Sequence, residues 1–387
     1  MRMQPTAFLL ALIAALLGCA SCLAPASAPP FTYRLRPLLP PEHPTAEEWQ
    51  EYLHAFHAEP DPTQPLPPPQ PPESFHRYTF PTSMNDAGSV CGSTRVKVVD
   101  LRNPTPGSPQ YTFVTRPFAY VDGAFQVIPV GGEPGASWNG SYAVDINERN
   151  EVVGFLWKAP PVPYLSQPFL WDGESVDLLE GVTGDPVAIN DDGLILTRDG
   201  LFEDGELVFA PPPANDLGLG YEVPFRPFDL GNDGTIVGTY GGHRAALWKD
   251  GLRTLLPEQA RSAYAINKQG VVLISWKDDS GVHKALWHDG TVSPVIAQGA
   301  LFFPQERWAY FNDDAALVGY AFGALQNIPA LYENGKLYNL TELVSNYDED
   351  PTLPKANFSS CSQMNNSGDI LAVKGGVTYI FERENAP

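Results

Sequence analysis

Oxygen-rich turns are the first residues of this chain whose types and spacing could support chemistry. The segments Asn190-Asp191-Asp192 and Asn312-Asp313-Asp314 each place three oxygen-bearing side chains in a short loop, and Ca²⁺ takes several such ligands. Neither segment has the spacing of a known calcium loop, and Asp is common in turns because its side chain bonds the turn backbone. We therefore expect these residues to shape turns, and we predict no metal site and no cofactor.

Other reactive side chains do not form a catalytic motif. The 7 histidines are scattered, and the chain has no Gly-x-Ser-x-Gly, no His-Glu-x-x-His and no phosphate-binding glycine loop. We predict no catalytic residue. A non-enzymatic role is favoured, although the sequence alone leaves enzymatic activity open.

The N-terminus has the features of an export signal. Arg2 is followed by an uncharged apolar run, residues 7–18, which is too short to span a bilayer as a helix. The run ends in Leu16-Leu17-Gly18-Cys19, which resembles the lipobox of bacterial lipoproteins, although Leu17 is a less usual residue there. The resemblance implies lipidation of Cys19 and a lipid anchor in the membrane. Ordinary signal cleavage within residues 24–28 is the alternative.

The predicted address is the cell envelope, as an outer-membrane lipoprotein or, without the anchor, a periplasmic or secreted protein. Two cysteines, Cys91 and Cys361, remain in the body of the chain. An oxidising compartment permits them to form a disulfide, and they lie in the first and last of the repeats described below. Two buried free thiols are the alternative.

Composition favours an all-β protein that does not bind nucleic acid. The 387 residues include 34 Gly and 40 Pro, which punctuate short strands. The formal net charge is −21, which repels phosphate backbones. We expect a soluble monomer apart from its anchor.

Repeated turn blocks are the strongest signal in the sequence. Each block has an apolar strand that ends at an Asn, a tight turn, and a second apolar strand that often ends in Gly. Asn caps such a turn through its side chain, and Gly or Asn at the last turn position accepts a positive φ. The seven anchoring asparagines are Asn85, Asn147, Asn190, Asn232, Asn267, Asn312 and Asn365.

A second block follows each of the first six. It is an apolar-aromatic strand with Asp-Gly or Asn-Gly behind it, as in Phe169-Leu170-Trp171-Asp172-Gly173 and Ala246-Leu247-Trp248-Lys249-Asp250-Gly251. This pattern is a strong hairpin signal. Two hairpins per unit give four short strands, so the chain is predicted to form a β-propeller of about seven four-stranded blades, with six or eight as alternatives.

The repeats from residue 78 to residue 382 resemble those of bacterial extracellular proteins with HAF repeats, named for a His-Ala-Phe step before the aromatic strand. The His survives near His243-Arg244-Ala245 and His283-Lys284-Ala285, whereas Arg116-Pro117 and Gln167-Pro168 replace it elsewhere. This drift argues against a shared histidine site.

The seventh unit lacks a fourth strand, and residues 31–38 (FTYRLRPL) are an orphan extended segment. We predict that this segment closes the seventh blade. The predicted organisation is a signal (1–18), a tether (19–30), the closing strand (31–38), one short helix at residues 45–56 within a Pro-rich insertion (39–74), and the repeats (75–387).

Specificity is expected in loops, because repeats form the scaffold and loops vary. Trp138, Tyr164 and Trp276 are the candidate binding residues, since aromatic rings stack on sugars and apolar groups. The leading hypothesis is an exported propeller that binds a protein or glycan partner in the envelope. The rival is a propeller hydrolase or lyase acting on an extracellular polysaccharide.

Overall fold

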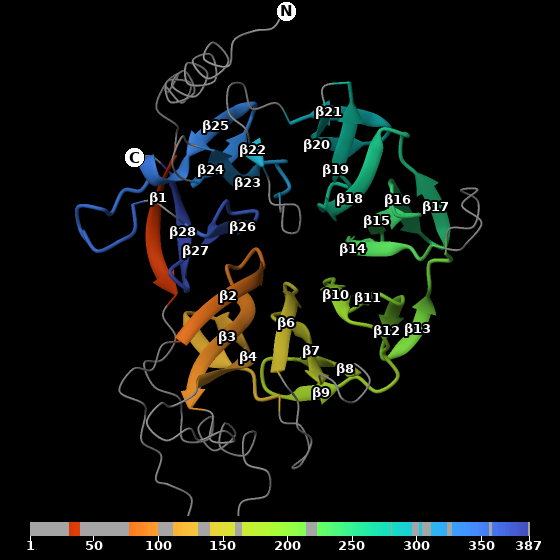
Figure 1. The fold of residues 1–387 in the computed structure, drawn as a ribbon, viewed down its shortest axis with the longest axis horizontal. Coiled ribbons are helices and arrows are strands. Elements are labelled where there is room, and N and C mark those ends of the chain that lie inside the picture. The colour runs from red at the N-terminus through yellow and green to blue at the C-terminus, as the bar shows by residue number, and fades with distance from the viewer. Residues whose placement is uncertain are drawn as a thin grey trace, which may run out of the picture. The chain divides into compact units, whose positions relative to one another are not determined.

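The computed structural model describes residues 31–38, 77–99, 111–130, 140–158, 165–213, 223–279, 281–295, 302–303, 311–322, 327–355 and 358–385. Within these ranges the regular structure is β-strand apart from one short 3-10 helix. The strands form seven four-stranded sheets. The fold is therefore all-β, and the sheets are the seven blades of a β-propeller (Figure 1).

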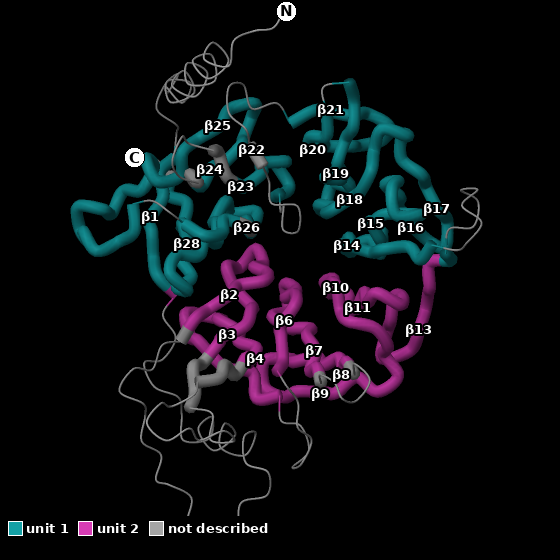
Figure 2. The backbone as a smooth tube through the Cα atoms, in the orientation of Figure 1, with its two compact units in different colours: residues 1–37, 212–387 teal, residues 38–211 magenta. Residues whose placement is uncertain are grey.

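The chain divides into two compact units (Figure 2). Unit 2, residues 38–211, contains three blades, whose strands follow one another in sequence order. Blade 1 is β2 (Arg77–Met84), β3 (Val90–Val99), β4 (Tyr111–Val121) and β5 (Ala124–Val127). Blade 2 is β6 (Gly140–Ile146), β7 (Val152–Lys158), β8 (Leu165–Trp171) and β9 (Val176–Leu178). Blade 3 is β10 (Pro186–Ile189), β11 (Ile195–Thr197), β12 (Leu201–Glu203) and β13 (Glu206–Phe209).

Unit 1, residues 1–37 and 212–387, contains the other four blades. Blade 4 is β14 (Arg226–Leu230), β15 (Ile236–Tyr240), β16 (Arg244–Lys249) and β17 (Leu252–Leu255). Blade 5 is β18 (Ala260–Ile266), β19 (Val272–Asp278), β20 (Gly281–His288) and β21 (Thr291–Pro294). Blade 6 is β22 (Phe302–Phe303), β23 (Leu317–Phe322), β24 (Asn327–Glu333) and β25 (Lys336–Asn339), followed by the 3-10 helix η1 (Leu340–Glu342). Blade 7 is β26 (Ser360–Met364), β27 (Ile370–Lys374), β28 (Val377–Asn385) and β1 (Phe31–Leu38).

The N-terminal strand closes blade 7, as predicted. The order in this sheet is β1-β28-β27-β26 (Figure 1), and Arg36 pairs with Glu382 of β28 at 2.7 Å. The free edge of β1 is also covered, because the backbone of Tyr33 bonds to Leu343 and Ser345. Asn346 completes this cover, since its side-chain amide accepts from Leu35 N at 2.9 Å and donates to Leu35 O at 3.0 Å.

Apolar packing between neighbouring blades forms the core. In unit 2, Ile128 of blade 1 packs with Val152 and Phe169 of blade 2. In unit 1, Leu247 of blade 4 packs with Val272 and Ile274 of blade 5. Burial of these side chains, at roughly 25 cal/mol per Å² of apolar surface, is the main force that stabilises one blade against the next.

The aromatic hairpins adopt the predicted turns. Residues with positive φ occupy both central positions at Asp122-Gly123, Asp204-Gly205, Asp250-Gly251, Asp289-Gly290 and Asn334-Gly335, which is the type I′ geometry that matches strand twist. Asp172-Gly173 differs, because only the glycine has a positive φ and Asp172 instead accepts hydrogen bonds from Glu174 N and Ser175 N. The helix predicted at residues 45–56 lies outside the described residues.

Candidate functional site

The repeated Asn closes its own turn, as predicted. In blade 2, the Oδ1 atom of Asn147 accepts from Glu151 N and from Arg149 N, both at 3.0 Å. The backbone N–H of Asn147 donates to Glu151 O at 3.1 Å. The same bond from the residue four positions later to the Asn oxygen recurs at Asn85, Asn190, Asn267, Asn312 and Asn365.

The same side chain also links one blade to the next, which the sequence did not predict. Nδ2 of Asn85 donates to the carbonyl of Asn147 at 2.9 Å, and Nδ2 of Asn147 donates to the carbonyl of Asn190 at 3.1 Å. In unit 1, Nδ2 of Asn267 donates to the carbonyl of Asn312 at 3.2 Å. The buried amide therefore fixes both a turn and the position of the neighbouring blade.

Blade 4 corrects the predicted register by one residue. Gly231, not Asn232, occupies the anchoring position, because Gly231 N donates to Thr235 O at 2.8 Å and Gly234 N donates to Gly231 O at 3.0 Å. Asp233 supplies the side-chain cap instead, accepting from Thr235 N at 3.0 Å.

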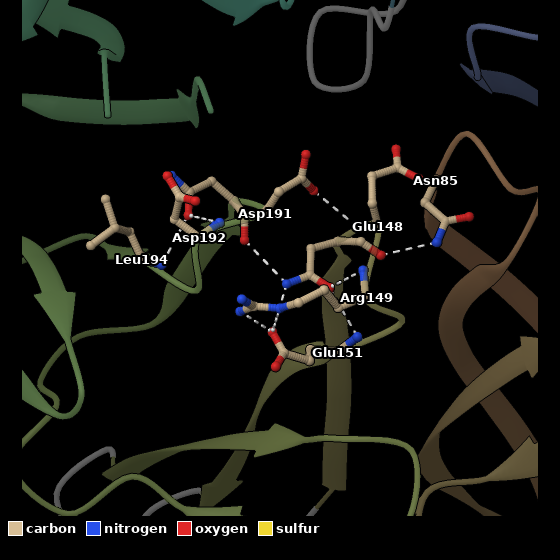
Figure 3. A network of polar contacts seen from close by, with 9 residues as sticks. Asn85, Glu148, Arg149, Glu151, Asp191, Asp192 and Leu194 are labelled. Carbon is tan, nitrogen blue, oxygen red and sulfur yellow. Dashed lines mark hydrogen bonds and ion pairs between the residues drawn. The ribbon is translucent and has the colours of Figure 1, made fainter. Parts of the chain in front are cut away.

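The acidic turn residues form a second set of links between blades. Oδ1 of Asp191 accepts from Glu148 N at 3.0 Å (Figure 3). The Glu148 carboxylate accepts from Asp86 N at 3.0 Å. In unit 1, Asp313 accepts from Lys268 N at 3.0 Å and from Nδ2 of Asn366 at 2.7 Å. These carboxylates therefore serve the scaffold by linking blades, a role that differs from the shaping of their own turns that the sequence predicted.

Two aspartates make a third type of link. Asp145 accepts from Ile146 N at 3.0 Å and, across to blade 3, from Ile189 N at 2.9 Å. Burial raises the pKa of Asp145, although these donors and the Ser83 side chain act to lower it. Asp229 repeats the arrangement in unit 1, accepting from Leu230 N and, in blade 5, from Ile266 N, both at 2.9 Å.

A β-bulge lies three residues before the anchoring position in six blades. The bulge residue is skipped in the Cα register with the second strand, as at Phe228, where Pro227 pairs with Gly238 and Asp229 pairs with Val237. The bulge residues are Thr82, Val144, Val187, Phe228, Tyr264 and Ser362. Two of these residues are hydroxylic, two are valine and two are aromatic, whereas the backbone geometry is the same.

The recurring Gly at the end of the second strand makes room for this bulge. A Cβ on Gly154 would overlap the carbonyl oxygen of Tyr142 and the ring of Phe169. A Cβ on Gly92 or Gly238 would meet a carbonyl oxygen of the first strand and a phenylalanine ring in the same way. The glycine is therefore required by close approach of the first strand.

Two adjacent bulge residues in unit 1 form an aromatic pair between blades. The ring centroids of Phe228 on β14 and Tyr264 on β18 lie 5.5 Å apart at an angle of 51°. Each ring carries a cation on one face: the Arg226 guanidinium is 5.0 Å from the Phe228 centroid, and Nζ of Lys284 is 3.5 Å from the Tyr264 centroid. Both rings are half-buried and Arg226 is exposed. We take this group, Arg226, Phe228, Tyr264 and Lys284, as the candidate site and call it the aromatic–cation group.

The candidate residues from the sequence do not form this site. Cys19, Trp138 and Tyr164 lie outside the described residues. Trp276 is in strand β19 rather than in a loop, where it is half-buried against the apolar cluster of blades 4 and 5. The aromatic–cation group was missed because the bulge depends on strand register. The available signal was an aromatic residue three positions before the anchoring turn in two successive repeats.

The two cysteines of the body are free thiols, the alternative to a disulfide. Cys91 is fully enclosed in unit 2 and Cys361 is 1% exposed in unit 1. Burial raises the pKa of Cys91, and it raises the pKa of Cys361 to about 12. Both groups are therefore protonated and unreactive at neutral pH.

The part of the chain that the structure describes has neither a metal-binding cluster nor a membrane-spanning helix. There, no group of three or more His, Cys, Asp or Glu side chains is placed to hold a metal ion. Within the same ranges, no helix has the length and apolar character needed to cross a membrane.

Comparison with known proteins finds distant structural similarity and no family. No protein-family model matches the chain, and no curated protein matches it. The chain is similar to the acylaminoacyl peptidase of Pyrococcus horikoshii, with 14% identity and a TM-score of 0.45 over 81% of this chain and 52% of that one. It thus spans about half the length of that peptidase.

Two further structures are similar to a lesser degree. One is Sqt1 of Chaetomium thermophilum bound to the N-terminus of a ribosomal protein, with 12% identity, a TM-score of 0.31, and coverage of 75% of this chain and 78% of that one. The other is a glycosyl hydrolase from Bacteroides ovatus, with 9% identity, a TM-score of 0.25, and coverage of 80% and 87%.

Proposed function

We propose that this chain is an exported, lipid-anchored β-propeller that binds a protein or glycan partner in the cell envelope. The observation that carries the proposal is the contrast between turns and bulges. Asn side chains and acidic residues in the turns are bonded to the scaffold, whereas the bulge position carries a hydroxylic, an aliphatic or an aromatic residue depending on the blade. A constant scaffold with varied presented residues is typical of binding repeats.

The proposed location in the cell envelope rests on the sequence. The lipobox-like Leu16-Leu17-Gly18-Cys19 precedes the closing strand β1. We also propose that the repeats belong to the HAF-repeat group. Palmitate labelling of the wild type and of Cys19→Ala tests the anchor. Label on the wild type alone supports it, and equal labelling of both proteins contradicts it.

The rival proposal, a hydrolase or lyase, is separated from binding by one experiment. The mature protein is incubated with immobilised acidic and neutral extracellular polysaccharides and with envelope extract, and retention and product release are measured together. We expect retention without new reducing ends, the product of a hydrolase, and without unsaturated uronates, the product of a lyase. Release of either product would support the enzyme.

A further inference from the structure

We propose that the aromatic–cation group binds an acidic saccharide, such as a uronic acid oligomer. The inference rests on the proposed binding function and names the ligand class and the residues for it. Aromatic rings present flat apolar faces suited to the C–H faces of sugars, and the two cations provide partners for carboxylates. No sequence motif marks these four residues, which come together only in the fold.

The site is built from three strands of two blades. Phe228 and Arg226 are on β14, Tyr264 is on β18 and Lys284 is on β20. Hydroxyl groups lie in the same region, because Thr239, which pairs with Arg226 in register, donates to Oγ of Ser262 at 2.9 Å. Rings, cations and hydroxyls are the three kinds of group that recognise a charged sugar.

Asp229 holds the two bulges at a fixed separation. It directly follows Phe228, and its carboxylate bonds Leu230 N in blade 4 and Ile266 N, two residues beyond Tyr264, in blade 5. Each oxygen accepts a backbone N–H, so this acidic group next to the site is occupied by the scaffold. We assign Asp229 as a positioning residue, which sets the ring separation without contacting the ligand.

Charge explains why the cations matter in this protein. The chain carries a formal net charge of −21, so an acidic ligand is repelled at long range. Binding then requires local cations, and Arg226 and Lys284 are held on ring faces at the site. Their attraction to the ligand is weakened by salt, as for any partly exposed charge pair.

The test is calorimetric titration of the mature protein with galacturonic acid hexamers and, separately, with neutral maltohexaose. We expect binding of the acidic hexamer only, and Phe228→Ala/Tyr264→Ala to weaken it by about tenfold or more, as for central aromatic anchors. The matched control is Tyr142→Ala/Phe155→Ala, which removes another stacked pair, 5.5 Å apart, in unit 2. We expect this control to bind as the wild type does.

Charge and position are tested with further variants. Arg226→Gln/Lys284→Gln should reduce the salt dependence of the affinity, and Asp229→Asn should weaken binding while its salt dependence stays at the wild-type value. Urea unfolding of each variant identifies loss of fold. The inference is overturned if maltohexaose binds equally well, or if a folded ring variant binds the acidic hexamer as the wild type does.

The acidic-saccharide site and the proposed binding function can fail independently. Binding of another polysaccharide, or of an envelope protein that survives Phe228→Ala/Tyr264→Ala, would overturn the acidic-saccharide site and leave the binding function standing. Product release in the polysaccharide assay would overturn the binding function itself.

Discussion

The ring of Phe228 lies 5.5 Å from the ring of Tyr264 although the two residues belong to different blades. Both are bulge residues at the same position relative to the anchoring turn. Their contact shows how the repeat works: the turn and the glycine fix the backbone, and the bulge places a side chain that differs between repeats.

Removing an anchoring amide should destabilise the protein strongly. Asn147→Ala deletes the acceptor for Glu151 N and the donor to the carbonyl of Asn190, so one bond that closes the turn and one bond between blades are lost together. We expect a loss of about 2–4 kcal/mol in the free energy of unfolding, measured by urea denaturation.

The matched control for that variant is Arg149→Ala in the same turn. Arg149 is exposed and pairs with Glu151 at 2.7 Å, and an exposed pair of this type contributes about 0–1 kcal/mol. Equal losses for the two variants would show that the Asn147 amide has no special role in the scaffold.

Adding one methyl group beneath a bulge should also be costly. Gly154→Ala places a Cβ against the Tyr142 carbonyl and the Phe169 ring, and overpacking of this type costs about 1–3 kcal/mol. Gly251→Ala is the control, because its Cβ would meet open space and only its φ of +73° opposes the change, at about 1 kcal/mol. A smaller loss at Gly154 than at Gly251 would refute the close approach.

Much of this fold was predictable from local patterns. The closing strand has the predicted limits, Phe31–Leu38, because its alternation and the missing fourth strand of blade 7 were both visible in the sequence. The Asp-Gly hairpins were predictable because their positive φ values require particular residues.

The site was not predictable, because it depends on register. The bulge at Phe228 exists only in the pairing of β14 with β15. Gly231 replaces Asn at the anchor of blade 4 because the backbone bonds of the turn need no side chain, so pattern matching selected Asn232. Trp276 also depends on strand pairing. It pairs with Ala260 and His283 on the two neighbouring strands, although the polar residues that follow it in the sequence favour a loop.

The buried carboxylate of Asp145 should impose a measurable pH dependence. Its pKa is raised by burial, so protonation is easier in the folded than in the unfolded chain. Its contribution to stability is full below the unfolded pKa of about 3.9 and is lost as pH rises through the folded pKa. Asp145→Asn removes this loss but also removes one acceptor for a backbone N–H.

We therefore expect Asp145→Asn to be less stable than the wild type at low pH and to recover relative to it as pH rises. Urea unfolding of both proteins across pH 3 to about 8, the range over which a raised carboxyl pKa acts, gives the difference directly. If Asp145→Asn instead loses stability relative to the wild type as pH rises, the folded protein stabilises Asp145 as a carboxylate.

The central claim is that the turn and glycine positions specify the fold, whereas the bulge position is free to present different side chains. It is tested most directly by exchanging bulge residues between blades, Val187→Phe with Phe228→Val, and measuring the free energy of unfolding in urea. We predict a change within about 1 kcal/mol, well below that of Asn147→Ala. A loss as large as that of Asn147→Ala would contradict the claim, because the bulge residue would then belong to the scaffold.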